Sequence, residues 1–411
     1  MFKISQDFAP PFKLIAPFFI IGSIFYFLSS LYLFSFDAEV LSFSSAKILA
    51  FVHLFLLGCV MMIIFGAMAQ LVPVVLEVGH FAVELFYAIW PLLLIGTILM
   101  VCGFLYSPAL LPFGGTIVLI SMMIFASEIF LTISKVKKLT VVMSSILISN
   151  TFLFFGVIFG LLMALSYAGT ISINISALLS AHIGSVLGGY IVITIMGLSV
   201  VLIPMFTLSH SFSLKPLKIA ITLMSTAVIL LILSSFFTID FLAYVAYILA
   251  IISMLTYLYL IYVIYKTRPR KENDIYAISL MYAYISMIVS LSMGALYFIL
   301  HKEEILLASM WLFFFGFLAF LITGHMYKII PFLVWFERFS PLVGKQKVPM
   351  LVDMVPPKSS QAQFVFCAVG VILVTVAILM KNNTFLDAGA SFLFIGTLAF
   401  VRNIFYMINF K

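Results

Sequence analysis

The chain is a succession of long apolar segments separated by short polar connections. Each segment runs for about 20 residues with few charges, which is the length that an α-helix needs to cross the hydrocarbon core of a bilayer. The pattern predicts twelve transmembrane helices, at residues 14–34, 48–70, 86–106, 109–133, 142–167, 178–203, 217–237, 242–266, 275–299, 305–328, 362–380 and 384–408. We therefore expect an all-α integral membrane protein in which residues 1–411 form a single transmembrane domain.

The composition excludes a soluble domain of ordinary size. Of the 411 residues, 65% are hydrophobic and 9% are charged, whereas a soluble domain is about 25% charged. The net charge of +7 does not indicate nucleic acid as a partner, because the basic residues lie between the apolar segments. The expected partner is the lipid bilayer. The three cysteines lie far apart in apolar segments, so neither a disulfide framework nor a zinc-thiolate site is expected.

The distribution of lysine and arginine predicts the orientation. If the N-terminus is cytoplasmic, all but three of the 21 Lys and Arg residues fall on the cytoplasmic side, as the positive-inside rule requires. We expect a multi-pass protein of a bacterial-type inner (plasma) membrane, with both termini cytoplasmic and no cleavable signal peptide. The longest connection, residues 329–361, contains five prolines and is predicted to be a cytoplasmic loop.

One spacing recurs three times: a glycine, a second glycine eight residues later, and a proline seven residues after that. The three copies are Gly58/Gly66/Pro73, Gly189/Gly197/Pro204 and Gly316/Gly324/Pro331. The copies predict three repeats of four helices each, at approximately 1–138, 139–271 and 272–411, arranged with pseudo-threefold symmetry. The glycines are predicted to allow close helix packing, and each proline is predicted to end its helix at the cytoplasmic surface.

The second predicted helix carries a more specific pattern. His53 is followed by a Gly66-Ala67 pair, and the helix closes with Leu-Val and Pro73. This segment resembles the core subunit of heme–copper oxidases and nitric oxide reductases, and residues 328–345 resemble a segment of NnrS-type (nitric-oxide-stress) membrane proteins. The resemblance implies a subunit I-like fold and a low-spin heme b with His53 as an axial ligand.

The chain also departs from that family. The helix predicted at 217–237 has no histidine, so a three-histidine copper site cannot be built there. Trp311 takes the place that His53 has in the first repeat, and His325 lies about 13 residues further along its helix than the resemblance requires. We therefore do not expect a standard dioxygen-reducing binuclear centre, we assign no catalytic residue, and enzyme activity is left open. Copper binding of another kind also stays open.

The histidines within predicted helices are the candidate metal or heme ligands. An ionisable side chain in a bilayer marks a functional site by default, although a neutral histidine bonded to a neighbouring helix is the alternative for each. The candidates are His53, His182 and His325. At 100° per residue, His53 lies about 140° around its helix from Gly58, whereas His182 lies within about 20° of Gly189.

The remaining polar residues are weaker candidates for a cofactor site. His80 and His210 are predicted to be solvated in cytoplasmic loops, and His301 to be a solvated loop residue or an outer heme ligand. The resemblance implies heme propionates on the outer side, where three lysines could pair with them, and anchoring of lipid headgroups is the alternative. These lysines are Lys47, Lys302 and Lys381. Neither Glu128 nor Asp387 has an obvious partner for a proton path.

Three functions stay open from the sequence. The first is a heme- or metal-binding protein of the oxidase-core type, with a redox or nitric-oxide-related role and respiratory-chain proteins as partners. The second is a transporter or channel for a small solute, in which histidines act as gates or proton relays. The third is a cofactor-free assembly partner of a respiratory complex.

Overall fold

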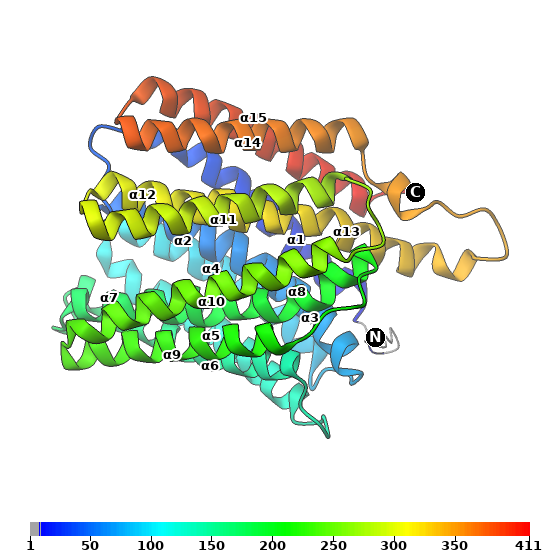
Figure 1. The fold of residues 1–411 in the computed structure, drawn as a ribbon, viewed down its shortest axis with the longest axis horizontal. Helices are drawn as coiled ribbons and strands as arrows, with labels where there is room; N and C mark the ends of the chain where they lie inside the picture. Colours follow the sequence, from blue (N-terminus) through cyan, green and yellow to red (C-terminus); the bar gives the residue numbers. More distant parts are fainter. Residues whose placement is uncertain (1–7, 9) are drawn as a thin grey trace. The chain divides into compact units, whose positions relative to one another are not determined.

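The computed structural model is built of helices and the loops that join them (Figure 1). It describes Phe8 and Pro10–Lys411, and no strand occurs among these residues. Twelve helices are long and apolar enough to cross a membrane, and each coincides with one of the twelve predicted segments. The described part of the chain is therefore consistent with a multi-span membrane protein.

Several spans are built from more than one labelled element. The α-helices are α1 (Phe12–Tyr32), α2 (Ala46–Phe55), α3 (Met62–Leu76), α4 (Phe86–Leu105), α5 (Leu111–Ile133), α6 (Val141–Tyr167), α7 (Ile175–Ile183), α8 (Ile193–Thr207), α9 (Lys215–Phe237), α10 (Asp240–Lys266), α11 (Ile275–Leu300), α12 (Glu303–Trp311), α13 (Ala319–Arg338), α14 (Pro357–Met380) and α15 (Asn383–Ile408). Three π-helical segments join pairs of these; they are η2 (Leu56–Met61), η5 (Gly184–Val192) and η6 (Leu312–Leu318).

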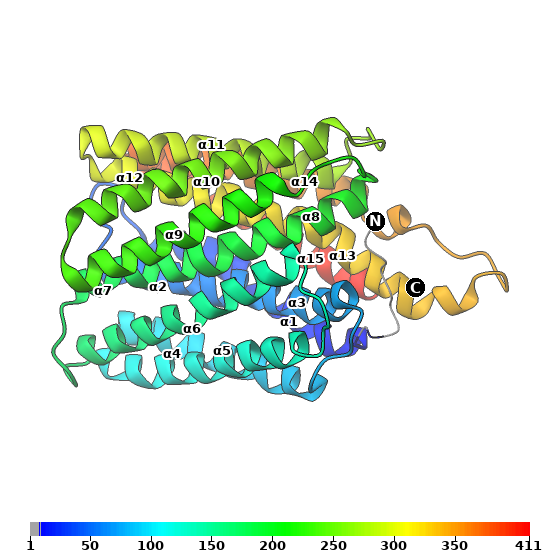
Figure 2. The ribbon, with the colours of Figure 1, turned by 60° about the horizontal axis from the view of Figure 1, so that its bottom comes forward.

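The described residues divide into two compact units. The first unit contains Met68–Lys271 and the short segment before Pro11, and the second contains Pro11–Ala67 and Glu272–Lys411. In the first unit, α9 and α10 run side by side, and α5 packs between α4 and α6 (Figures 1 and 2). In the second unit, α14 pairs with α15, which also packs against α1, while α11 packs along α12, η6 and α13. Short connections join α4 to α5, α9 to α10 and α14 to α15, so each of these pairs is an antiparallel hairpin.

The three spans that carry the repeated glycines share one irregular feature. They are the longest spans, at 31, 33 and 36 residues, and each contains a π-helical segment in its interior. The first glycine of each copy lies inside that segment: Gly58 in η2, Gly189 in η5 and Gly316 in η6. A π-helical turn is rare and is frequently found at functional sites. The π-helical segments thus recur along the chain with the same spacing as the Gly/Gly/Pro motif.

The repeated glycines do allow close packing. Added Cβ atoms at Gly58 and Gly66 would collide with Phe25 and Phe18 on α1. Equivalent collisions occur in the other two copies: Gly189 and Gly197 face α6, and Gly316 and Gly324 face α11. In each copy, therefore, both glycines contact the span immediately before them in the chain. The repeat boundaries and the pseudo-threefold arrangement stay predictions.

The predicted effect of the three prolines is wrong. Pro73, Pro204 and Pro331 all lie inside helices, which continue to Leu76, Thr207 and Arg338. A proline removes one backbone donor, but a helix can continue when neighbouring groups satisfy the freed carbonyl. As a result, α13 extends into the predicted loop 329–361, and the connection between α13 and α14 is shorter than expected, at residues 339–356.

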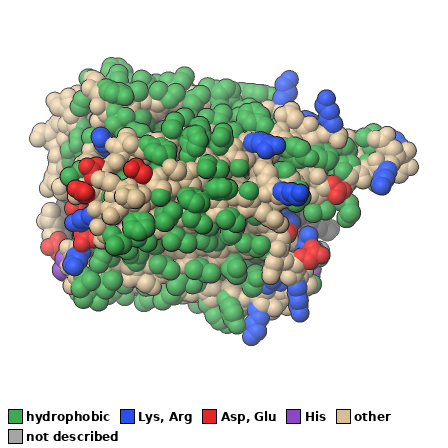
Figure 3. All heavy atoms as spheres, turned by 90° about the horizontal axis from the view of Figure 1, so that it is seen from above, with side chains coloured by type: hydrophobic (Ala, Val, Ile, Leu, Met, Phe, Trp, Pro, Cys, Tyr) green, Lys and Arg blue, Asp and Glu red, His purple; other side chains and the backbone are tan. Residues whose placement is uncertain are grey.

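Hydrophobic side chains cover the middle of the face drawn in Figure 3, and charged side chains gather toward its ends. Large apolar residues are exposed along several helices, among them Phe241 at 70%, Tyr259 at 60% and Ile285 at 53%. Exposed apolar surface of this extent is unfavourable in water. It is suited to contact with lipid acyl chains.

Candidate functional site

His53 lies on α2 in the second unit, three residues before the π-helical segment. Its Nδ1 lies 2.8 Å from the backbone oxygen of Leu49, one turn earlier in the helix. Because a carbonyl oxygen can only accept, Nδ1 must donate, and the lone pair of the neutral ring then lies on Nε2. The side chain is half-buried.

His182 lies on α7 in the first unit and is held in the same way. Its Nδ1 donates to the backbone oxygen of Gly156 on α6, at 2.7 Å. The ring lies against Gly160, where an added Cβ would come within 2.8 Å of the imidazole Cε1. A glycine is therefore needed opposite the ring, and the bond to α6 fixes the ring orientation.

His325 lies on α13 in the second unit and is buried. Its Nδ1 donates to the backbone oxygen of Leu321 at 2.7 Å, and its ring meets the ring of Tyr276 edge-on, with the centroids 5.2 Å apart. Its Nε2 has no hydrogen-bond partner among the described residues. A buried ring nitrogen without a partner costs free energy, so this atom is a candidate ligand position.

An aromatic stack fills the interior of the second unit beside α2. Trp311 on α12 stacks on Phe315 with centroids 4.3 Å apart, and Phe315 stacks on Phe55 at 4.5 Å. The indole Nε1–H of Trp311 donates to the backbone oxygen of Val371 at 3.1 Å. Trp311 thus has a packing role at the place where the resemblance would put a second histidine, and a bis-histidine pair between α2 and α12 is not formed.

The three outer lysines lie in the second unit and are exposed. Lys47 donates to the backbone oxygen of Ser35 at 3.1 Å, and Lys381 lies 3.7 Å from a carboxylate oxygen of Glu304. Lys302 directly precedes α12. Two of the three therefore have protein partners, and their pairing with heme propionates stays a prediction.

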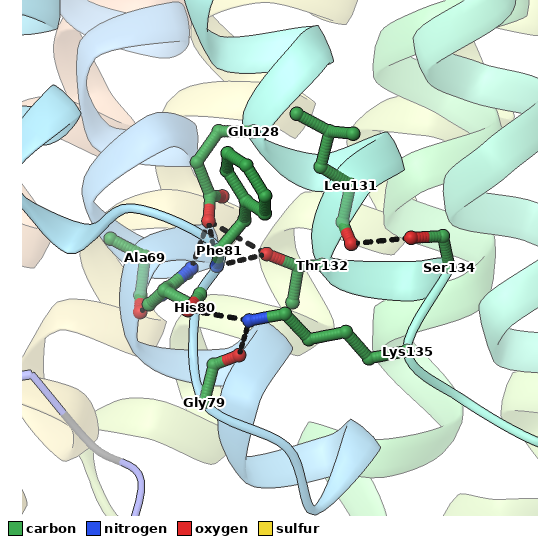
Figure 4. A network of polar contacts seen from close by, with 9 residues as sticks. All are labelled: Ala69, Gly79, His80, Phe81, Glu128, Leu131, Thr132, Ser134 and Lys135. Atoms are coloured by element: carbon green, nitrogen blue, oxygen red, sulfur yellow. Dashed lines mark hydrogen bonds and ion pairs between the residues drawn. The ribbon is translucent and has the colours of Figure 1, made fainter.

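The prediction for His80 is wrong, whereas those for two other loop histidines agree with the structure. His210 and His301 are exposed, and so is Asp387. The side chain of His80 is only 2% exposed and forms a contact with Glu128, whose side chain is fully buried (Figure 4). Residues that sequence reasoning treated as a solvated loop position and an unpartnered carboxyl are in fact a pair.

Both ring nitrogens of His80 are used. Nε2 donates to the backbone oxygen of Ala69 at 2.6 Å, and Nδ1 lies 2.8 Å from Oε1 of Glu128 (Figure 4). The same carboxyl oxygen accepts from the backbone N–H of Phe81 at 3.0 Å and from the hydroxyl of Thr132 at 2.7 Å. The other oxygen, Oε2, is buried and has no hydrogen-bond partner among the described residues.

Pro73 explains why His80 turns inward. A proline at position 73 cannot donate to the carbonyl four residues earlier, which belongs to Ala69. His80 donates to that same carbonyl and replaces the missing helical bond. The sequence did contain a signal for this contact, because a proline in a helix interior is followed by a histidine seven residues later. Lys135 also holds the segment that contains His80, because its ammonium group donates to the backbone oxygens of Gly79 and His80.

Among the residues described, no group of three or more His, Cys, Asp or Glu side chains is arranged to hold a metal ion. His53 and His325 belong to the second unit and His182 to the first, so each is considered as a single ligand position. The chain matches no protein-family model, and no curated protein matches it.

Proposed function

We propose that this chain is a heme- or metal-binding integral membrane protein of the oxidase-core type, with a redox or nitric-oxide-related role. One observation carries the proposal. The three histidines within the long, π-containing spans all donate Nδ1–H to a backbone carbonyl, which places the lone pair of each neutral ring on Nε2, the atom that would bind a metal. Histidines that bind metals usually donate their other ring N–H to a carbonyl or carboxylate, which fixes the tautomer and ring orientation.

His53 is the residue we assign to a heme, and His182 and His325 are the further candidates for a metal. When bound, a heme supplies an iron that accepts an electron or a small gas molecule. The chain contributes the orientation of each ring, through the carbonyls of Leu49, Gly156 and Leu321. The stack around Phe315 fills the interior beside α2 with aromatic rings. Since α9 has no histidine, the proposal does not include dioxygen reduction at a three-histidine copper centre.

The absorption spectrum of protein purified from heme-replete cells tests the proposal. We expect a Soret band that is lost in His53→Ala and retained in His210→Ala, because His210 is an exposed loop residue. Metal analysis of the same samples tests whether the protein binds a metal without heme. In that case we expect His182→Ala and His325→Ala to lower the metal content. A colourless, metal-free preparation would contradict the proposal.

The buried His80–Glu128 pair favours a second candidate, a proton-coupled transporter of a small solute. Ionisable pairs within membrane segments mark proton relays and ion pathways. In sealed proteoliposomes with a trapped pH indicator, we expect the native protein to dissipate an imposed pH gradient faster than Glu128→Gln. Equal rates for the two proteins, matching those of empty liposomes, would remove this candidate.

A further inference from the structure

One end of the α9–α10 hairpin, in the first unit, is strongly basic. All Lys and Arg residues between positions 208 and 271 lie at this end: Lys215, Lys218, Lys266, Arg268, Arg270 and Lys271. Asp240, the sole acidic residue of that segment, begins α10 at the opposite end, and Glu272 is the next acidic residue along the chain. A basic cluster of this size at the end of a membrane span is typical of proteins that bind anionic lipid.

A hydrogen bond fixes the relative depth of the two helices. Ser253 Oγ on α10 donates to the backbone oxygen of Ala220 on α9 at 2.7 Å. Because the hairpin is antiparallel, counting five residues from this contact along each helix brings Lys215 level with Leu258. From there α10 continues to Lys266, which is about 12 Å further at 1.5 Å per residue. Charged side chains avoid the hydrocarbon core, so the lysines of α9 and the last turns of α10 lie at the level of lipid headgroups.

Exposed tyrosines accompany these cations. Tyr259 and Tyr262 are 60% and 57% exposed, and Lys266 Nζ lies 5.7 Å from the ring centroid of Tyr262. Arg268 stacks on Tyr265, with its Cζ 3.4 Å from the ring centroid and its Nη1 donating to the backbone oxygen of the same residue. Tyrosines at a membrane interface keep the ring in the apolar region and the hydroxyl at the headgroups. Their hydroxyls can therefore donate to a phosphate while their rings hold the cations in place.

The exposed surface that adjoins the basic end is apolar. Ile219 on α9 is 53% exposed, and Leu255 and Ile248 on α10 are 55% and 57% exposed. Acyl chains can lie along this surface while a headgroup meets the cations. A nucleic acid or an acidic protein would instead leave the apolar part uncovered. The combination of positive charge with adjoining apolar surface therefore favours a phospholipid as the partner.

We propose that the basic end of the α9–α10 hairpin is a binding site for a phospholipid with an anionic headgroup. Lys215, Lys218 and Lys266 attract the headgroup, and the hydroxyl of Tyr259 donates to its phosphate. A zwitterionic lipid binds less tightly, because the lysines repel its positive group. The inference rests on the helices crossing a bilayer and not on the binding of a heme or metal.

Native mass spectrometry of the full chain, titrated with phosphatidylglycerol or with phosphatidylcholine of the same acyl chains, tests the site. We expect the parent protein to bind phosphatidylglycerol more tightly. Each Lys or Arg near a membrane surface raises the affinity for anionic lipid about fivefold, so Lys215→Gln combined with Lys218→Gln should weaken this binding about 25-fold. Tyr259→Phe, which keeps the ring and removes the hydroxyl, should also weaken it.

Two matched controls separate the site from the rest of the surface. Lys137→Gln combined with Lys138→Gln removes the same charge from an exposed loop of the same unit. Tyr244→Phe is the control for Tyr259→Phe, since Tyr244 is also 60% exposed but lies near the opposite end of α10. Both controls should bind phosphatidylglycerol with the affinity of the parent.

The site is refuted if the parent binds the two lipids equally. It is also refuted if both lysine double variants weaken the binding equally, since a general attraction to basic loops would then explain it. An unchanged affinity in Tyr259→Phe, or displacement of the lipid by an equal concentration of inorganic phosphate, would likewise overturn the proposal.

Discussion

At the scale of single residues, the arrangement around His80 shows how one backbone defect determines a side-chain position. Pro73 leaves the carbonyl of Ala69 without its helical donor, and His80 supplies one. The opposite ring nitrogen then faces Glu128, 48 residues away in sequence. A buried carboxyl is tolerated because Phe81 and Thr132 also donate to it.

We predict strong coupling between His80 and Glu128. Removing one partner of a buried pair leaves the other uncompensated and costs about 3 kcal/mol of folding free energy. His80→Ala and Glu128→Gln should each destabilise the protein, and the double variant should be more stable than additivity predicts, by about 2 kcal/mol. Unfolding in mixed detergent–SDS micelles gives the four free energies.

His210→Ala is the control for this cycle, because His210 is exposed. It should leave the free energy of unfolding unchanged. Additive effects of His80→Ala and Glu128→Gln would show that the two side chains do not interact in the folded protein.

At the scale of elements, the three long spans are distinguished by their π-helical segments and by the glycines within them. The spacing of the glycines was sufficient to predict close helix contacts, because only glycine lets two backbones approach so closely. It was not sufficient to predict the π-helical turns, since these depend on the partner helix as well as on local sequence. The prediction that each proline ends its helix was wrong for a similar reason, because α13 continues through Pro331 where nearby packing supports it.

Two adjacent glycines in η5 offer a test of this packing. A Cβ at Gly189 would lie 2.5 Å from Cβ of Phe152, an atom fixed to the backbone of α6. At Gly188 the nearest atom is the terminal Cγ2 of Val228, at 3.2 Å. We expect Gly189→Ala to destabilise the protein by about 2 kcal/mol, as overpacking typically does, and Gly188→Ala to have a clearly smaller effect.

Thermal unfolding in detergent measures both variants. Each substitution replaces a glycine in the same segment, so the change in helix propensity is shared and the difference between the two reports the collision with α6. Equal melting temperatures for the two variants would contradict the packing role of Gly189.

At the scale of the whole molecule, the number of the spans and their approximate positions followed directly from the sequence, whereas the ends of the longest spans did not. Length and apolarity decide which segments cross a bilayer, and these are local properties. The polar contacts did not follow, because their members are distant in the chain: Asn403 Nδ2 donates to the hydroxyl of Tyr327, 76 residues away. Of the predicted ligand residues, the sequence located the histidines, but only the structure showed which ring nitrogen each one uses.

The predicted orientation can be checked at the two ends of α6. In a background with all three cysteines replaced by alanine, Thr170→Cys should be labelled by a membrane-impermeant maleimide from the outer side, and Lys137→Cys from the cytoplasmic side. Both positions are exposed in loops. We expect at least a tenfold difference in labelling rate in right-side-out vesicles, with the opposite order in inverted vesicles.

Equal labelling of the two positions from one side would contradict a span between them. The reverse order in both vesicle types would instead invert the orientation and place the termini outside.

The π-helical turns also change how these spans must be drawn on a helical wheel. Eight residues of ideal α-helix would rotate Gly66 about 80° away from Gly58, yet both glycines contact α1. A wider turn advances by a smaller angle per residue, so η2 removes much of that rotation and aligns the two glycines on one stripe. Any periodicity plot with a fixed 100° step therefore loses phase in the middle of each long span. The angle of 140° between His53 and Gly58, which assumes such a step, overstates how far the imidazole is turned from that stripe.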